Sequence, residues 1–242
     1  MEPPPMDTPG TLYRRHRFPA EIISHCVWLY FRFCLSYRDI EEMMMVRGVL
    51  VTYETIRQWC QKFGQTFAND LRRRRARPGD KWHLDEVFLK INGQTQYLWR
   101  AVDQDGIGLD ILVQPHRDKA AAKRFFRKLL KGLHYVPRVL ITDKLLSYGA
   151  AKAELLPGVE HRQHQGLNNR AENSHQPTRE RERRMRRFKS PAHAQRFLSA
   201  QGIIASHFRP GRHRLRAPAY RQQMAQCFQT WRAVTRLACQ SA

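Results

Sequence analysis

The sequence lacks an apolar run long enough to cross a membrane. Its longest such run, residues 26–31, falls far short of the roughly 20 residues that a spanning helix needs. The N-terminal residues also lack the basic and apolar regions of a secretory signal. Cysteine is scarce, with 5 residues and no C-x-x-C pair. We therefore expect neither a disulfide framework nor a structural zinc site, and we expect a reducing, cytoplasmic location.

Two common catalytic signatures are missing as well. The chain contains no Walker A loop, so we expect no nucleotide cofactor. Neither Ser147 nor Ser174 lies in a G-x-S-x-G context, so nothing supports a hydrolase triad.

Acidic residues are few for a chain of this size. The 21 Asp and Glu residues stand against 43 Lys and Arg residues, which gives a net charge of +22. No acidic residue follows Glu182, while 13 Lys and Arg residues do. Such an excess repels itself unless a polyanion neutralises it, and nucleic acid is the commonest polyanion. No long amphipathic helix sets a bulky apolar face beside the basic residues, so a membrane surface is the weaker candidate partner.

The first part of the chain has the pattern of a helical DNA-binding domain. Residues 1–17 are rich in proline and glycine and predict a flexible tail. Ser36 and Thr52 are good N-caps, and Gly48 suits the turn between the helices that they begin. Three short helices are predicted: one opening at Pro19, one over residues 37–46 and one over residues 53–63. This order is typical of a helix-turn-helix domain, which we assign to residues 18–78.

The outward face of the third predicted helix carries polar side chains. Arg57, Gln58 and Gln61 face away from its apolar stripe, and arginine and glutamine read guanine and adenine in the major groove. We expect these residues, together with Tyr53 and Lys62, to contact DNA. An ordinary solvated helix face is the alternative for each of them.

A basic run follows the third helix. Four consecutive arginines, residues 72–75, precede Pro78 and Gly79. Like charges followed by Pro-Gly predict a basic linker and a domain boundary.

The pattern changes to strands from Lys81 onward. Strands are predicted over residues 82–91, 96–103, 109–113, 139–142 and 159–163, with helices over 119–131 and 145–155. The rest is mostly helical in pattern. Three meandering strands followed by strand–helix units predict an α/β fold, a mixed sheet with helices on both sides, in a domain of residues 79–242.

Three carboxylates are candidate site residues. Asp85 lies within a predicted strand, Asp143 directly follows the buried strand at residues 139–142, and Glu172 stands alone in a basic stretch. Each has an ordinary alternative: an Asp85 satisfied by a backbone donor or an arginine, an Asp143 that forms a turn or caps a helix, and a Glu172 that counters a helix dipole. Together, three hard oxygen donors on one sheet could hold two Mg²⁺ ions, with Mn²⁺ as an alternative, to act on a phosphodiester.

At these residues the sequence resembles the DDE transposases of bacterial insertion sequences, and especially the insertion-sequence-six family. The resemblance covers roughly residues 15–210. The matching segments are Trp82-His83-Leu84-Asp85-Glu86, Tyr97-Leu98-Trp99-Arg100-Ala101-Val102-Asp103, Thr142-Asp143-Lys144, Glu160-His161-Arg162-Gln163 and Asn168-Asn169-Arg170-Ala171-Glu172. Arg179 occupies the position of the basic residue that follows the glutamate by seven in the wider DDE pattern.

The resemblance implies a ribonuclease-H-like fold, the integrase catalytic core, with Asp85, Asp143 and Glu172 as a catalytic and metal-binding triad. Lys144, Arg170 and Arg179 are then expected to contact DNA. The implied protein is a transposase that binds the terminal inverted repeats of its element. It cleaves DNA 3′ ends and transfers strands, as a homodimer or larger assembly on double-stranded DNA in the bacterial nucleoid. Transposition by this protein would be replicative and would form a cointegrate. A helix-turn-helix regulator without enzymatic activity, or an inactive decayed transposase, is the alternative.

Two features depart from the family pattern. Only 28 residues separate Asp143 from Glu172, and the shortening falls in the loop near residues 155–158. Pro177 follows Glu172 by five residues, and proline inside a helix costs about 3 kcal/mol or more. The helix with Glu172 is therefore either kinked or ends near His175 and restarts, which bears on where Arg179 lies.

Overall fold

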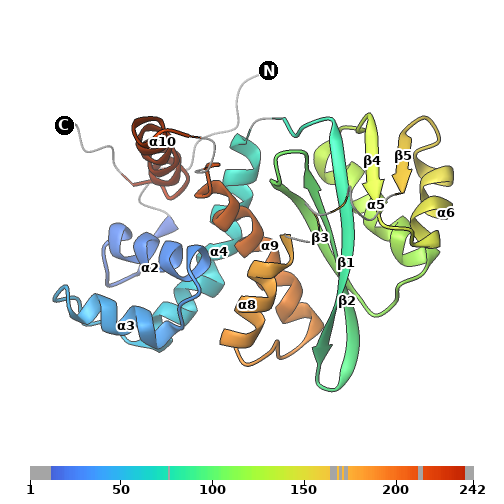
Figure 1. The fold of residues 1–242 in the computed structure, drawn as a ribbon. Helices are drawn as coiled ribbons and strands as arrows, with labels where there is room; N and C mark the ends of the chain where they lie inside the picture. Colours follow the sequence, from blue (N-terminus) through green and yellow to red (C-terminus); the bar gives the residue numbers. More distant parts are fainter. Residues whose placement is uncertain are drawn as a thin grey trace. The chain divides into compact units, whose positions relative to one another are not determined.

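The chain forms two compact units. The computed structural model describes residues 12–75, 77–163, 168, 171, 174–211 and 215–237. The helical unit comprises Met1–Arg75 and Ile203–Ala242, and the sheet unit comprises Ala76–Gly202. Figure 1 labels the elements of both. Within the described ranges, no helix combines the length and the apolar character needed to cross a membrane.

The helical unit contains the three N-terminal helices that the sequence predicted. They are α2 (Ala20–Arg32), α3 (Tyr37–Met45) and α4 (Tyr53–Arg74). Ser36 and Asp39 form a complete capping box at the start of α3. The Thr52 side chain accepts a hydrogen bond from the Thr55 N–H at the start of α4. Gly48, in the connection between these helices, has a φ of 74°, which glycine adopts without strain.

Helix α4 is much longer than the sequence suggested. It continues past Phe63 to Arg74, so most of the arginine run predicted as a linker is helical. The apolar stripe continues at helical spacing through Phe67 and Leu71, both buried, and this burial favours the extra turns. Arginines in the last turn also suit the negative end of the helix dipole.

The C-terminal residues group with the N-terminal helices. The sequence assigned all of residues 79–242 to one domain, whereas the helical unit includes Ile203–Ala242 with α10 (Ala217–Val234). Aromatic packing within the helical unit explains this grouping. The rings of Phe67 and Trp231 lie 5.4 Å apart, as do those of Trp28 and Phe228. Helix α9 (Pro191–His207) runs across the boundary between the units.

The sheet unit is built on a mixed sheet of five strands in the order β3-β2-β1-β4-β5. Strands β1, β2 and β3 form an antiparallel meander. Strand β4 pairs in parallel with β1, and β5 pairs in parallel with β4. The strands are β1 (Lys81–Ile91), β2 (Gln94–Asp103), β3 (Gly108–Gln114), β4 (Val139–Thr142) and β5 (Glu160–Gln163). All five lie close to their predicted positions.

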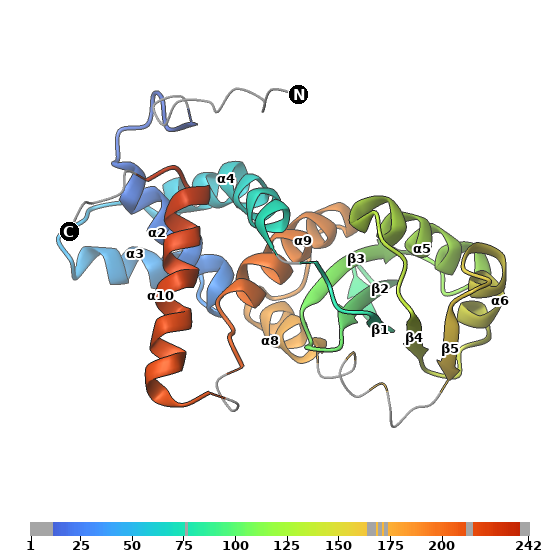
Figure 2. The same cartoon turned by 90° about the horizontal axis from the view of Figure 1, so that it is seen from above.

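Helices cover both faces of this sheet (Figure 2). Helices α5 (Lys119–Leu133) and α6 (Leu146–Leu155) lie on one face, and α8 (Gln176–Arg184) and the start of α9 on the other. The main core lies under α5 and α6, where Trp82 and Leu84 of β1 and Trp99 of β2 are fully buried. Strand order and flanking helices are those of a ribonuclease-H-like fold, as predicted.

Candidate active site

The register of two parallel strands brings Asp85 and Asp143 together. Strand β4 pairs with β1 so that Ile141 lies beside His83. Continuing this register by two residues sets Asp143, just after the end of β4, beside Asp85. The Asp143 carboxylate also accepts a hydrogen bond from the Leu145 N–H at 3.0 Å, which fixes its direction. The turn-forming role that was the alternative for Asp143 thus coexists with its place beside Asp85.

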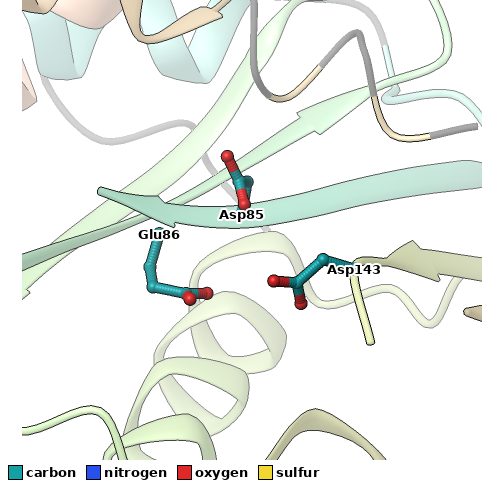
Figure 3. A group of neighbouring side chains, drawn as sticks. All are labelled: Asp85, Glu86 and Asp143. Carbon is teal, nitrogen blue, oxygen red and sulfur yellow. The ribbon is translucent and has the colours of Figure 1, made fainter. Parts of the chain in front are cut away.

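A third carboxylate, which the sequence analysis missed, completes an acidic group at this position. Asp85, Glu86 and Asp143 each offer one oxygen, and these oxygens lie within 4.8 Å of one another. Figure 3 shows Glu86 and Asp143 turned toward each other on one side of β1 and Asp85 projecting on the other. Strand alternation places neighbours on opposite faces, so periodicity gave no reason to pair Glu86 with Asp85.

Glu86 is the most buried of the three, and two donors hold it. The Tyr148 hydroxyl donates to Oε2 at 2.7 Å, and Arg117 Nε donates to Oε1 at 2.5 Å. The Glu86 side chain is only 2% exposed, and burial raises its pKa to about 7, opposed by these two donors. Burial also raises the pKa of Tyr148. Both Glu86 oxygens are therefore already hydrogen-bonded within the protein.

Arg117 is the cation among these acids. Besides its bond to Glu86, its Nη2 lies 3.6 Å from Asp143 Oδ2. One guanidinium therefore contacts two of the three carboxylates, and further positive charge would stabilise the group. Hard carboxylate oxygens in such a cluster suit Mg²⁺ or Mn²⁺. Asp85 and Asp143, whose side chains are 15% and 28% exposed, are the members open enough to bind an ion from solvent.

Asp85 contacts a buried histidine. His175 Nε2 lies 3.2 Å from Asp85 Oδ2, and the histidine side chain is 7% exposed. Burial lowers the pKa of His175, and its contact with Asp85 opposes this. His175 stands at the N-cap position of α8, which begins at Gln176 with Pro177 in its first turn. A helix therefore begins there, with Pro177 at a position where proline is tolerated. Glu172, whose helix the two alternatives concerned, lies outside the described residues.

The basic residues predicted to contact DNA have varied surroundings in the sheet unit. Lys144 is exposed directly after Asp143. Arg179 lies on α8 with its guanidinium 4.9 Å from the centre of the Phe88 ring, and it donates to Glu182 at 3.1 Å. Glu172 and Arg170, the third predicted acid and the remaining predicted DNA contact, lie outside the described residues.

The predicted DNA contacts of the helical unit lie at the start of α4. Arg57 forms two bonds to Glu54, at 2.6 and 2.7 Å, and Gln58 donates to the same carboxylate. These bonds lower the pKa of Glu54 to about 2. Glu54 therefore holds both side chains in place on the helix surface.

The other three predicted contacts are also on this face. Gln61 is exposed, Lys62 contacts His16, and Tyr53 lies under the guanidinium of Arg38 at 5.2 Å.

Comparisons with known proteins agree with the class that fold and acidic group define, a ribonuclease-H-like protein with a carboxylate site. A family model described as a DDE domain matches residues 79–210, more than half of the chain. The transposase for insertion sequence-like element IS431mec of Staphylococcus aureus is 33% identical over 168 residues, 67% of this chain and 75% of that protein. The transposase for insertion sequence element IS257 in transposon Tn4003, from the same species, matches equally well.

A structural comparison matched a chain of the simian T-cell lymphotropic virus intasome in complex with PP2A regulatory subunit B56 gamma. The TM-score is 0.34 at 18% identity, over 44% of this chain and 39% of that one. The sequence matches, by contrast, show the family. The chain belongs to the DDE transposases of bacterial insertion sequences, of the insertion-sequence-six type.

Proposed function

We propose that this chain binds the terminal inverted repeats of its insertion sequence and catalyses metal-dependent 3′-end cleavage and strand transfer. The observation that carries the proposal is the pairing of Asp85 and Asp143 at the end of β4, in a chain of this family. Carboxyl ends of strands in α/β sheets are where sites commonly form.

Asp85, Asp143 and Glu172 would hold two Mg²⁺ ions, with Mn²⁺ as an alternative. When bound, the ions would stabilise charge on the attacking and leaving oxygens of a phosphodiester. Glu172 precedes His175 by three residues in the sequence, a length that spans at most about 11 Å even when extended. Because His175 contacts Asp85, this short connection supports Glu172 as the third ligand.

Glu86 is the weaker candidate for the third ligand, since Tyr148 and Arg117 already form hydrogen bonds to its two oxygens.

The proposed reaction has two steps on DNA. Water attacks the phosphorus at the element end, an oxygen–phosphorus bond forms, and the bond to the 3′ oxygen breaks to leave a 3′ hydroxyl. That hydroxyl then attacks a phosphorus of the target strand, which releases a target 3′ hydroxyl. The carboxylates position the site, and exposed cations such as Lys144 would bind phosphates, with Arg170 and Arg179 in the same role. No protein side chain is bonded to DNA in either step.

The helical unit would recognise the element ends through α4. Arg57, Gln58 and Gln61 would reach base edges. The excess of Lys and Arg residues, a net charge of +22, would neutralise phosphates of the DNA backbone. Two ends must be held together for strand transfer, so we propose a homodimer or larger assembly and a replicative, cointegrate-forming outcome.

The test is strand cleavage of duplex DNA that carries the element's ends, with Mg²⁺ and with EDTA. We expect Asp85→Asn, Asp143→Asn and Glu172→Gln to lose at least about 10³-fold in rate, because metal-ion stabilisation is worth several kcal/mol. DNA binding should be retained in all three. Asp105→Asn, at an exposed turn of the same unit, is the matched control and should cleave normally.

Binding of the ends by wild-type protein without cleavage would overturn the proposal. It would favour the regulator or the decayed transposase instead.

A further inference from the structure

A buried arginine ties β2 to the start of α8 directly across from Asp85. Arg100 is the register partner of Asp85 in the β1–β2 pair. Its Nη1 donates to the Ser174 carbonyl at 2.6 Å, and its Nη2 donates to the Thr178 hydroxyl at 2.9 Å. Arg100 is 8% exposed and Thr178 fully buried. Charge-assisted bonds of this kind in a buried setting hold a segment firmly against the sheet.

His175 lies between the two residues that Arg100 holds. Its Nε2 is 3.2 Å from Asp85 Oδ2, within ion-pair distance, and neither ring nitrogen has any other polar partner in the part of the chain that the structure describes. Asp85 is therefore the polar contact that orients the ring. Among the same residues, His175 is likewise the one side chain within ion-pair distance of Asp85.

We propose that His175 positions the Asp85 carboxylate for metal binding and that Arg100 keeps His175 in place. This inference rests on the proposed function of the site. A ring nitrogen 3.2 Å from one carboxylate oxygen would restrict the torsion of Asp85 and leave its second oxygen for an ion. Hydrogen bonds to metal-ligating carboxylates commonly act in this way, and their loss typically weakens metal binding 10- to 100-fold.

The test is Mn²⁺ affinity of the full chain, measured by calorimetry or electron paramagnetic resonance without DNA. We expect His175→Leu to weaken Mn²⁺ binding about 10- to 100-fold. His175→Gln, whose amide nitrogen can stand near the Nε2 position, should come within about threefold of wild type. His193→Leu makes the same chemical change on α9, outside the site, and should bind Mn²⁺ as wild type does.

Arg100 is tested through His175. Arg100→Lys cannot make both bonds to Ser174 and Thr178, so it should weaken Mn²⁺ binding when His175 is present. In a His175→Leu background it should add little, because residues that act through one another are not additive. Full additivity of the two changes would overturn the role of Arg100.

Three outcomes separate this inference from the proposed function. Mn²⁺ binding that survives both Asp85→Asn and Asp143→Asn overturns the metal site itself. Loss in those variants but wild-type affinity in a folded His175→Leu overturns only the positioning role. If His175→Leu does not fold, His175→Asn replaces it, because its shorter amide does not reach the Nε2 position. The His175→Asn variant should then bind Mn²⁺ more weakly than the His175→Gln variant, and equal affinities of the two would overturn the inference.

Discussion

The side-chain amide of Asn168 donates a hydrogen bond to the backbone carbonyl of Leu84 at 2.9 Å. The two residues stand 84 positions apart, and both are fully buried. Leu84 immediately precedes Asp85, so this bond holds Asn168 against β1 next to the acidic group. Arg100 holds Ser174 and Thr178 in a similar way, from β2.

Removing this amide should destabilise the sheet unit. Asn168→Ala leaves a buried carbonyl without its donor, which costs about 1–3 kcal/mol. Asn168→Asp should cost more, because an ionised carboxylate cannot donate and is buried. Thermal unfolding in EDTA measures both changes. Asn69→Ala, on the exposed surface of α4, is the control and should stay within about 0.5 kcal/mol of wild type. A melting temperature of Asn168→Ala equal to that of the control would contradict the prediction.

Arg117 should act as the counter-charge of the acidic group. Arg117→Gln removes the guanidinium that pairs with Glu86 and faces Asp143. In EDTA we expect a melting temperature lower by a few degrees, since about 1 kcal/mol shifts it 2–4 °C in a chain of this size. Added Mn²⁺ should then raise the melting temperature more than in wild type, because the ion supplies the missing charge.

The control for this prediction is Arg127→Gln, an exposed arginine on α5 that should behave as wild type in both conditions. A smaller Mn²⁺ effect in Arg117→Gln than in wild type would mean that Arg117 helps to hold the ion rather than substituting for it.

Most of the fold was predictable because it depends on local patterns. Alternation identified the strands, N-caps such as Ser36 marked helix starts, and the run Val139–Thr142 had the continuous apolar character of a strand buried on both faces. The end of α4 was not predictable in the same way. Its extension to Arg74 depends on the burial of Phe67 and Leu71, which tertiary packing decides.

The site was predictable only in part. Asp85 stood out as an acid within a predicted strand, where burial makes charge costly, and Asp143 as an acid directly after a buried strand, where sites commonly form. Glu86 and His175 gave no such signal: one is on the opposite strand face, and the other is a lone histidine before a proline-containing helix start. Their roles arise from contacts with Tyr148, Arg117 and Asp85, which come from distant parts of the chain.

Gly64 should be essential to the packing of α4 against α2. An added Cβ at this position would lie 2.4 Å from the buried ring of Phe31. Gly→Ala normally favours a helix by about 1 kcal/mol, but overpacking a core costs typically 1–3 kcal/mol. We therefore expect Gly64→Ala to lower the free energy of unfolding, measured in urea. Combining it with Phe31→Leu should recover part of the loss. Stabilisation by Gly64→Ala alone would show that Phe31 moves aside without cost.

The free energy of unfolding of the helical unit should decrease when the pH is lowered below about 6.5. Burial lowers the pKa of His207, with its bond to the Cys227 carbonyl opposing the shift, and burial lowers the pKa of His25 as well. Unfolding restores an ordinary histidine pKa near 6.5, so below that pH the unfolded chain binds protons that the folded chain does not. The free energy of unfolding therefore decreases as pH falls from about 6.5 toward the lowered pKa values, and it is unaffected by these groups above pH 7.5.

His207→Gln tests this dependence directly. The glutamine amide can still donate to the Cys227 carbonyl, which His207 contacts at 2.9 Å, but it does not titrate. Urea unfolding at pH 7.5 and pH 5.5 should show a smaller loss of stability in the variant. The difference should stay well below the limit of about 1.4 kcal/mol per pH unit for one group, because His207 is partly exposed. Equal slopes for His207→Gln and wild type would show that His207 takes up a proton as readily in the folded chain as in the unfolded one.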